Sequence, residues 1–186
     1  MKIEEYIKNN VDKRFDGNLP FKTVNKTVKK KSILTNFGQF ESKVYFLNKG
    51  IIQVEIDSSK EIRILDFFFE NSFFSSYSSL LNQTASDVRI RAITECDIEI
   101  IEYADLQQSY ESSLIANKLG RFETEKLYLK RVLREKMLLT ENAKDNYLLL
   151  TTKYPEVIKR IPLKDIAKYL GITPESLSRI RKTLIS

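Results

Sequence analysis

The chain has 186 residues, with 31 Lys and Arg against 25 Asp and Glu, a single cysteine and no histidine. The length allows one domain or two small ones. Without histidine, the usual catalytic base, the commonest metal ligand and the usual haem ligand are missing. One cysteine excludes an internal disulfide and an iron–sulfur cluster within one subunit. Since the five glycines form no phosphate-binding loop either, we expect a protein that is not an enzyme and holds no metal or cofactor.

Neither a membrane span nor a leader is visible in the sequence. No apolar run approaches the ~18 residues that a span needs, and Ile3–Val11 contains acidic residues, unlike a signal peptide. We therefore expect a cytoplasmic protein without membrane contact, in which Cys96 is a small buried residue. From Glu141 onward, nine basic residues stand against five acidic ones. This excess would favour phosphate contacts, although a solvated surface explains it equally well.

The first hundred residues are predicted to form a short amphipathic helix over Ile3–Val11 and then several short strands. The predicted strands are Lys43–Leu47, Ile51–Ile56, Glu61–Phe69, Val88–Thr94 and Asp97–Glu102. We expect the first two to form a hairpin over the turn at residues 48–50, and the last two to form another pair. Many short strands without intervening long helices favour a closed antiparallel β-roll over a parallel sheet.

A short helix is predicted over Asp105–Glu111, and a long one follows it. The long helix has an apolar seam with coiled-coil-like spacing, formed by Ile115, Leu119, Phe122, Leu129, Leu133 and Met137. The seam could pack on the roll of its own chain, but a second strip of Tyr128, Val132 and Leu139 is available for that purpose. We therefore predict that the seam is a homodimer interface.

The C-terminal residues are predicted to be helical. Asn142–Tyr154 is a predicted helix with Tyr147, Leu148 and Leu150 in the core, and Pro155–Arg160 is a shorter one. Two further helices are indicated around Gly171, which permits the left-handed conformation that ends a helix. The apolar stripe of the first is formed by Leu163, Ile166, Ala167 and Leu170, and that of the second by Leu177, Ile180 and Leu184. Thr173 can cap the second helix, with Pro174 at its first position.

The second helix of this pair has a polar face opposite its apolar one. Glu175, Ser178, Arg179 and Lys182 fall within about a 100° arc. Packed on its partner by the apolar face, the helix would offer the polar face to a DNA major groove, as in a helix-turn-helix. An ordinary helical hairpin with a solvated face is the alternative. Arginine can bond guanine bidentately and glutamate can accept from cytosine, which favours DNA binding.

The string Ile166-Ala-Lys-Tyr-Leu-Gly-Ile-Thr-Pro-Glu-Ser-Leu-Ser-Arg179 resembles the DNA-binding helices of the Crp/Fnr family of bacterial transcription regulators. Its Glu-x-x-Ser-Arg pattern is similar to that of the Fnr branch, whereas the Crp branch carries an Arg where this chain has Pro174. The resemblance implies base contacts by Glu175, Ser178 and Arg179. The residues expected to contact the DNA backbone are Lys164, Thr173, Arg181 and Lys182.

The spacing of Gly38, Tyr45-Phe46-Leu47 and Gly50 resembles the start of the cyclic-nucleotide-binding roll of the same family. The resemblance implies an α+β chain with a roll over residues 1–112, a dimerisation helix over 113–140 and a helix-turn-helix domain over 141–186. It further implies a homodimer on an inverted repeat of double-stranded DNA, with RNA polymerase as a further candidate partner. Because the chain stops after the second helix of the pair, we expect no C-terminal β-wing.

The ligand site departs from the family pattern. Members that bind cyclic nucleotides carry Gly-Glu for the ribose and an Arg for the phosphate. Alignment on Arg91–Thr94 places Ser75 and Ser76 on the Gly-Glu and Ser86 on the Arg. Each lost charge-assisted bond costs about 1.5–3 kcal/mol. We predict that the affinity for cAMP and cGMP is too low for regulation. The sequence does not identify the effector.

Two questions about this region stay open. Arg89 or Arg91 could replace the missing arginine if it pointed inward, but a surface-exposed position is favoured. The loop Ser72–Ser79 could serve another ligand or simply pack. The sequence therefore favours a dimeric transcription regulator over the alternative, a metabolite sensor or protein-interaction adaptor built on a β-roll without DNA binding.

Overall fold

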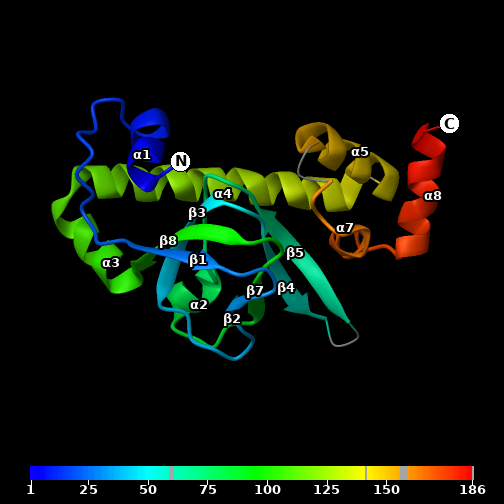
Figure 1. Cartoon of the computed structure of the whole chain (residues 1–186), viewed down its shortest axis with the longest axis horizontal. Coiled ribbons are helices and arrows are strands. Elements are labelled where there is room, and N and C mark those ends of the chain that lie inside the picture. The colour runs from blue at the N-terminus through cyan, green and yellow to red at the C-terminus, as the bar shows by residue number, and fades with distance from the viewer. Residues whose placement is uncertain (59–60, 141, 156–158, 186) are drawn as a thin grey trace.

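The computed structural model describes residues 1–58, 61–140, 142–155 and 159–185. Figure 1 shows a β-roll with the long helix α4 (Leu114–Thr140) running along it from end to end. Helices α1 (Ile3–Asn10) and α3 (Tyr103–Ser112) lie near the first half of α4, and the C-terminal helices gather at its other end. No helix within these ranges is both long and apolar enough to cross a membrane.

The roll consists of two four-stranded sheets in which all neighbouring strands are antiparallel. The first sheet has the order β1 (Val24–Val28), β8 (Cys96–Glu102), β3 (Lys43–Lys49), β6 (Ser72–Phe74). The second has the order β2 (Ile33–Thr35), β7 (Val88–Ala92), β4 (Ile52–Asp57), β5 (Ile62–Phe68). The apolar sides face one another, with Leu47, Ile52, Ile90 and Ile98 fully buried between them. The predicted antiparallel roll and the buried Cys96 are confirmed.

The strand partners differ from the sequence prediction. β3 and β4 do not form a hairpin, because β3 pairs with β6 and β8 whereas β4 pairs with β5 and β7. For the same reason, β7 and β8 are not a pair. The chain crosses between the sheets at Gly50, whose φ of +111° and close approach to Cys96 exclude a side chain. The alternation of apolar and polar residues predicts which face of a strand is buried, but it does not predict which strand pairs with it.

The long helix packs on the roll and on the N-terminal helix. Ile3, Ile7, Phe46 and Leu119 belong to one buried cluster that joins α1, β3 and α4. Gly120 has a packing reason, since a Cβ there would lie 2.9 Å from the ring of Tyr110 in α3. Glycine thus lets α3 and α4 approach closely. A short helix α2 (Tyr77–Asn82) lies in the segment between β6 and β7.

The two apolar strips of α4 differ in part from the roles expected of them, since half of the seam packs within the chain and only Val132 of the second strip is half-buried. Leu119 is only 4% exposed, and Ile115 and Phe122 pack against the same intramolecular cluster. Tyr128 and Leu139, expected to pack on the roll, are 68% and 79% exposed. The expectation that the whole seam stays free is therefore wrong for its first half, because α1 and α3 leave that side no access to a partner. Of the remaining seam residues, Leu129 and Leu133 are exposed and Met137 is half-buried.

The C-terminal helices are α5 (Ala143–Lys153), α7 (Leu163–Leu170) and α8 (Pro174–Ile185). Asn142 caps α5 by accepting from the backbone N–H groups of Lys144 and Asp145 at 2.9 and 3.0 Å. Tyr147 and Leu150 are buried as expected, but Leu148 is exposed, because it lies about 100° around the helix from Tyr147. The predicted helix over residues 155–160 falls largely on residues 156–158, outside the described ranges.

Candidate nucleic-acid interface and roll cavity

The turn between α7 and α8 has the geometry that its sequence predicts. Gly171 ends α7 at φ +71°, and the backbone N–H of Ile172 donates to the carbonyl of Ala167 at 3.0 Å. This is the six-to-one hydrogen bond of a Schellman ending, which satisfies a carbonyl that the helix end leaves open. The direction of the chain after α7 is therefore set by local hydrogen bonds.

Thr173 starts α8. Its Oγ1 accepts from the backbone N–H of Ser176 at 3.2 Å and donates to the Oγ of Ser176 at 3.1 Å. Pro174, the first residue of α8, lacks only an N–H that a first helical turn leaves unpaired in any case. The predicted cap is thus confirmed, and it fixes where the helix begins.

A buried cluster holds α8 against α7. Leu177 is fully buried against the face of α7 that carries Ile166 and Ala167, which are also fully buried. Ile180 and Leu184 are half-buried on the same side of α8. Because this side is fixed by packing, the opposite side of α8 faces outward.

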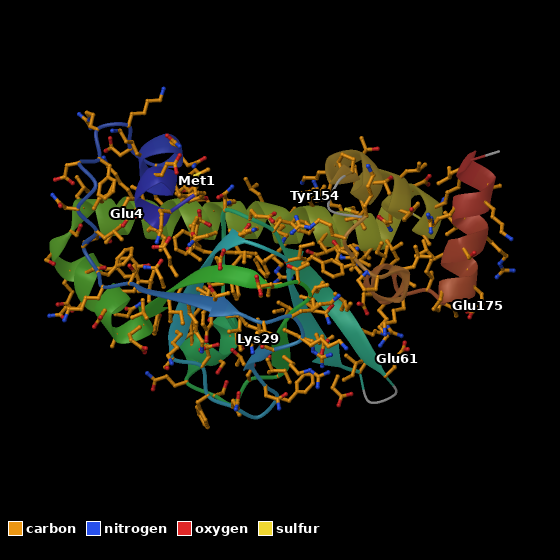
Figure 2. All side chains as sticks on the ribbon, in the orientation of Figure 1. Met1, Glu4, Lys29, Glu61, Tyr154 and Glu175 are labelled. Carbon is orange, nitrogen blue, oxygen red and sulfur yellow. The ribbon has the colours of Figure 1, made fainter. Side chains whose placement is uncertain are left out.

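The outward side of α8 carries the predicted base-contacting residues. Glu175, Ser178, Arg179 and Lys182 are all exposed. Figure 2 shows Glu175 at the start of α8, at the end of the molecule away from Met1. Arg179 donates to the Oγ of Ser176 at 3.3 Å, which orients its guanidinium along the helix. Of the predicted backbone contacts, Lys164 and Thr173 are exposed and Arg181 is half-buried.

The charge state of Glu175 suits the predicted role. A hydrogen bond from its own backbone N–H, together with the positive charge of Arg179, lowers the pKa of its carboxyl below the usual value. Glu175 is therefore an ionised acceptor at neutral pH, as a contact to a cytosine amino group requires. The contacts of Glu175, Ser178 and Arg179 to bases stay a prediction.

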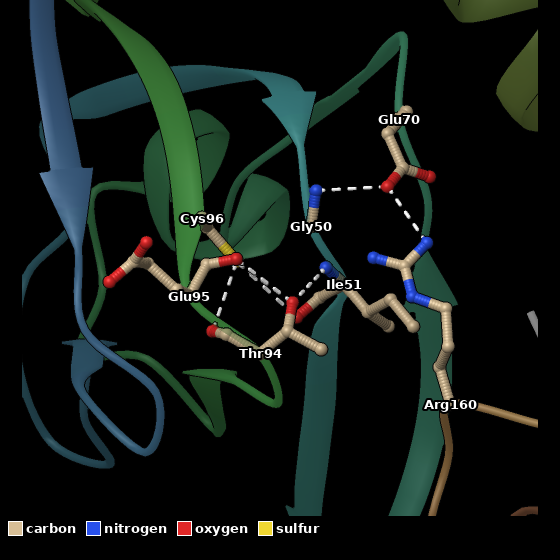
Figure 3. Close-up of polar contacts among 7 residues, drawn as sticks. All are labelled: Gly50, Ile51, Glu70, Thr94, Glu95, Cys96 and Arg160. Atoms are coloured by element: carbon tan, nitrogen blue, oxygen red, sulfur yellow. Dashed lines mark hydrogen bonds and ion pairs between the residues drawn. The ribbon is translucent and has the colours of Figure 1, made fainter.

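The C-terminal helices are docked on the roll of the same chain. Their cluster includes Ile51, Phe67 and Ile93 of the roll, and the ring of Phe67 lies 5.3 Å from that of Tyr169 in α7. The guanidinium of Arg134 in α4 stacks on Tyr169 at 4.0 Å from its ring centre. Glu70 accepts from Arg160 at 3.0 Å and from the backbone of Gly50 at 3.0 Å, as Figure 3 shows. The C-terminal helices are thus held against both the roll and α4.

The serines of the degenerate ligand site are engaged in hydrogen bonds within the protein. The hydroxyls of Ser76 and Ser86 lie 2.7 Å apart, and Ser86 also donates to the carbonyl of Val88 at 2.8 Å. Both serines are buried. Ser75 lies apart from this pair and donates to the carbonyl of Lys43 at 2.7 Å. Ser76 and Ser86 are thus brought together at the predicted place, without a charged group for a phosphate.

The two strand arginines face away from the roll interior. Arg89 and Arg91 alternate with the buried residues Val88, Ile90 and Ala92 and form ion pairs with the buried carboxylate of Glu55. Their side chains are 20% and 31% exposed. Both arginines are therefore on the outer face, as favoured, but only partly exposed, because their ion pairs with Glu55 hold them against the protein. Neither arginine replaces the one missing from the ligand site.

A cavity of about 380 Å³ lies between the roll, helices α2 and α3, and α4. Its lining comes from segments far apart in the sequence, from Val44 in β3 to Arg131 in α4. Sequence reasoning missed the cavity because strand pairing and helix docking create it together. The serine-rich loop at residues 72–78 contributes one wall, so this loop both packs and borders an open space.

Comparison with known proteins gives one family match and several structural ones. A model of the cyclic nucleotide-binding domain matches residues 25–113, whereas no curated protein sequence matches. The c-di-GMP responsive global regulator CLP of Xanthomonas campestris superposes with a TM-score of 0.70 at 17% identity, over 87% of this chain and 86% of that one. FixK2 of Bradyrhizobium japonicum also gives 0.70, at 18% identity over 88% and 84%. A protein from Eubacterium rectale assigned to the Crp/Fnr family of transcriptional regulators gives 0.64, at 17% identity over 99% and 83%.

Proposed function

The chain is Crp/Fnr-like in its roll, long helix and C-terminal helices, and from this premise we propose that it is a sequence-specific DNA-binding regulator of transcription. In this proposal, residues 1–112 form the sensor, 113–140 the dimerisation helix and 141–186 the DNA-binding domain. The observation that carries the proposal is the outward face of α8, where Glu175, Ser178 and Arg179 are exposed while Leu177 fixes the opposite face.

The proposed protein binds DNA as a homodimer. Two copies related by a twofold axis would place their α8 helices in successive major grooves about 34 Å apart, on an inverted repeat. The exposed apolar side chains of α4 support this assembly, since a monomer would leave Tyr128, Leu129, Leu133 and Leu139 in water. Sedimentation of the Tyr128→Glu/Leu139→Glu variant should give a monomer, and an unchanged dimer would contradict this interface.

The proposal excludes cAMP as the effector. Ser76 and Ser86 satisfy one another, so a cyclic phosphate would find no cation in their place. Titration calorimetry with cAMP should show no binding at concentrations that saturate cyclic-nucleotide-dependent regulators. Saturable micromolar binding would contradict this part of the proposal.

Base reading is tested by mobility shifts on a selected inverted repeat and its point mutants. Arg179→Ala should cost about 1–3 kcal/mol of binding free energy and remove discrimination at one base pair of each half-site. Lys182→Ala should weaken binding to all sequences alike, because a phosphate contact carries no base information. Arg14→Ala, which removes an exposed arginine far from α8, is the matched control and should change nothing.

A uniform loss for Arg179→Ala on every sequence would contradict base reading. The alternative function, a metabolite sensor or adaptor without DNA binding, is favoured by the cavity in the roll. It predicts that no duplex from a randomised library is retained at low salt, whereas the regulator proposal predicts binding that falls steeply as salt rises.

A further inference from the structure

We propose that the cavity in the roll binds a small apolar acid, a molecule with an elongated hydrocarbon body and a single anionic head, with the head at Arg131. The inference rests on the proposed regulator function in one respect only, which is that this ligand would be its effector. The walls of the cavity, the charges at one end of it and its length support this site.

The body of the cavity is apolar. Its walls include Val54, Leu65, Phe68, Phe74, Val88 and Ile101. The volume of about 380 Å³ lies within the range of about 300–1,000 Å³ that small-molecule sites have. Against these apolar walls a ribose and a cyclic phosphate would lose their water, and the lining hydroxyls of Ser75 and Ser76 already bond within the protein. A hydrocarbon gains free energy on the same transfer.

The charged residues at the cavity are Glu123, Lys126, Lys130 and Arg131, all on α4. Glu123 is already engaged, since it lies 3.5 Å from the ammonium of Lys126 and accepts a hydrogen bond from Tyr6. Lys130 is engaged as well, at 2.7 Å from the carboxylate of Asp66 and 4.4 Å from the ring centre of Phe68. These contacts hold both residues in place beneath the cavity.

Arg131 is paired less closely than Glu123, Lys126 and Lys130. Within the described part of the chain, its only ion pair is with Asp66, at the long distance of 3.9 Å, and Asp66 already has Lys130. A guanidinium carries five N–H donors in a fork that fits a carboxylate. Lys130 and Arg131 together face one aspartate, which leaves an excess positive charge at this end. An anionic head would satisfy that excess.

The other end of the cavity, near Gly120, has phenols and the mutually paired Glu123 and Lys126. Tyr77, Tyr103 and Tyr110 line it, and burial, followed by the proximity of the other two phenols, raises the pKa of Tyr110 to about 12. Burial also raises the pKa of Tyr103, so that Tyr103 and Tyr110 stay protonated at neutral pH. Arg131 lies eleven residues along α4 from Gly120, which contacts Tyr110, a distance of about 16 Å at 1.5 Å per residue. The site is therefore elongated, and only one of its ends suits an anion.

The test uses the full-length protein with 8-anilinonaphthalene-1-sulfonate as fluorescent reporter and decanoate and 1-decanol as competitors. Both competitors have the same chain length and differ in the head group. Decanoate should displace the reporter at one site per chain, with an affinity about 3- to 10-fold higher than that of 1-decanol, because water screens a guanidinium that is 43% exposed. Equal affinities, or reporter binding that does not saturate, would overturn the proposal.

Two arginine variants on the same helix separate the head group from general charge effects. Arg131→Gln should abolish the preference for decanoate and leave the affinity for 1-decanol unchanged. Arg121→Gln removes an exposed arginine that does not line the cavity and should leave both affinities unchanged. A preference that survives in Arg131→Gln, in protein whose thermal unfolding is unaltered, would assign the anion to another place and refute the site.

Mobility shifts on the same preparations distinguish the two proposals. Saturable decanoate binding in a protein that ignores all DNA would refute the regulator function and leave the cavity site standing. DNA binding without any difference between decanoate and 1-decanol would refute the cavity site alone.

Discussion

The α7–α8 hairpin is stabilised by contacts between residues close in the sequence, whereas the β-roll is stabilised by contacts between residues far apart in the sequence. In the hairpin, the shape is set by near neighbours: Gly171 ends one helix, Thr173 bonds Ser176, and Leu177 packs on α7. In the roll, β1 pairs with β8, so that Val24 lies opposite Ile100. Local chemistry therefore positions the proposed DNA-reading face, whereas the cavity exists only when distant strands have found their partners.

The largest expected effect is a loss of stability at Gly50, where the chain crosses between the two sheets of the roll. Gly50→Ala should lower the free energy of unfolding by about 3–6 kcal/mol, because a side chain is strained at φ +111° and its Cβ would lie 2.6 Å from both Cys96 Sγ and the carbonyl oxygen of Glu95. Urea unfolding measures the change. Gly17→Ala is the matched control, since φ there is +97° but no atom lies within 4 Å of the new Cβ.

The control separates backbone strain from close packing. If Gly17→Ala and Gly50→Ala are equally destabilising, strain alone explains the corner, and the contact between the sheets at Cys96 contributes nothing. A larger loss for Gly50→Ala confirms that the crossing between sheets depends on residues far apart in the sequence.

The same difference explains how much could be predicted from the sequence. Gly171 and Thr173 were predicted to end and begin helices, and both do so, because a helix end is determined within about six residues. Strands β3, β4, β5, β7 and β8 were predicted near their observed positions, whereas β1, β2 and β6 were not predicted. The predicted strand partners were wrong at Gly50, where the chain changes sheet. A pattern of buried residues contains no information on which strand lies opposite.

In the candidate sites too, local features could be predicted from the sequence and long-range contacts could not. The exposure of Glu175 and Arg179 follows from helix periodicity alone, so the sequence was sufficient for it. The cavity required α4 to lie over the roll with Gly120 against Tyr110, an approach that no short-range pattern indicates. The first half of the α4 seam was misassigned for this reason as well, since the docking of α1 and α3 decides what is left exposed.

The second prediction tests whether the hairpin and the roll unfold separately. Leu177→Ala should cost about 2–5 kcal/mol, because the side chain is fully buried and its removal leaves a cavity. Ile51 and Phe67 of the roll belong to the same cluster as Leu177, so we expect one cooperative unfolding transition in calorimetry. Leu138→Ala, which truncates an exposed leucine of α4, is the control and should cost little.

An early, separate transition in Leu177→Ala would be the opposite outcome. It would show that the C-terminal helices can leave the roll while the roll stays folded. The contacts of Tyr169 with Phe67 and Arg134 would then be too weak to couple the orientation of α8 to the state of the cavity.

The smallest expected effect concerns the cap of α8. Thr173→Ala removes the acceptor for the backbone N–H of Ser176 and should cost about 1 kcal/mol of stability. Thr183→Ala is the control, because that hydroxyl only bonds a carbonyl within the helix, to Arg179, and its loss should stay within about 0.5 kcal/mol. Since Thr173 is also a predicted phosphate contact, DNA affinity should fall more than stability does, and equally for all sequences. An affinity loss confined to certain base pairs would instead mean that the cap governs how Glu175 is presented to the bases.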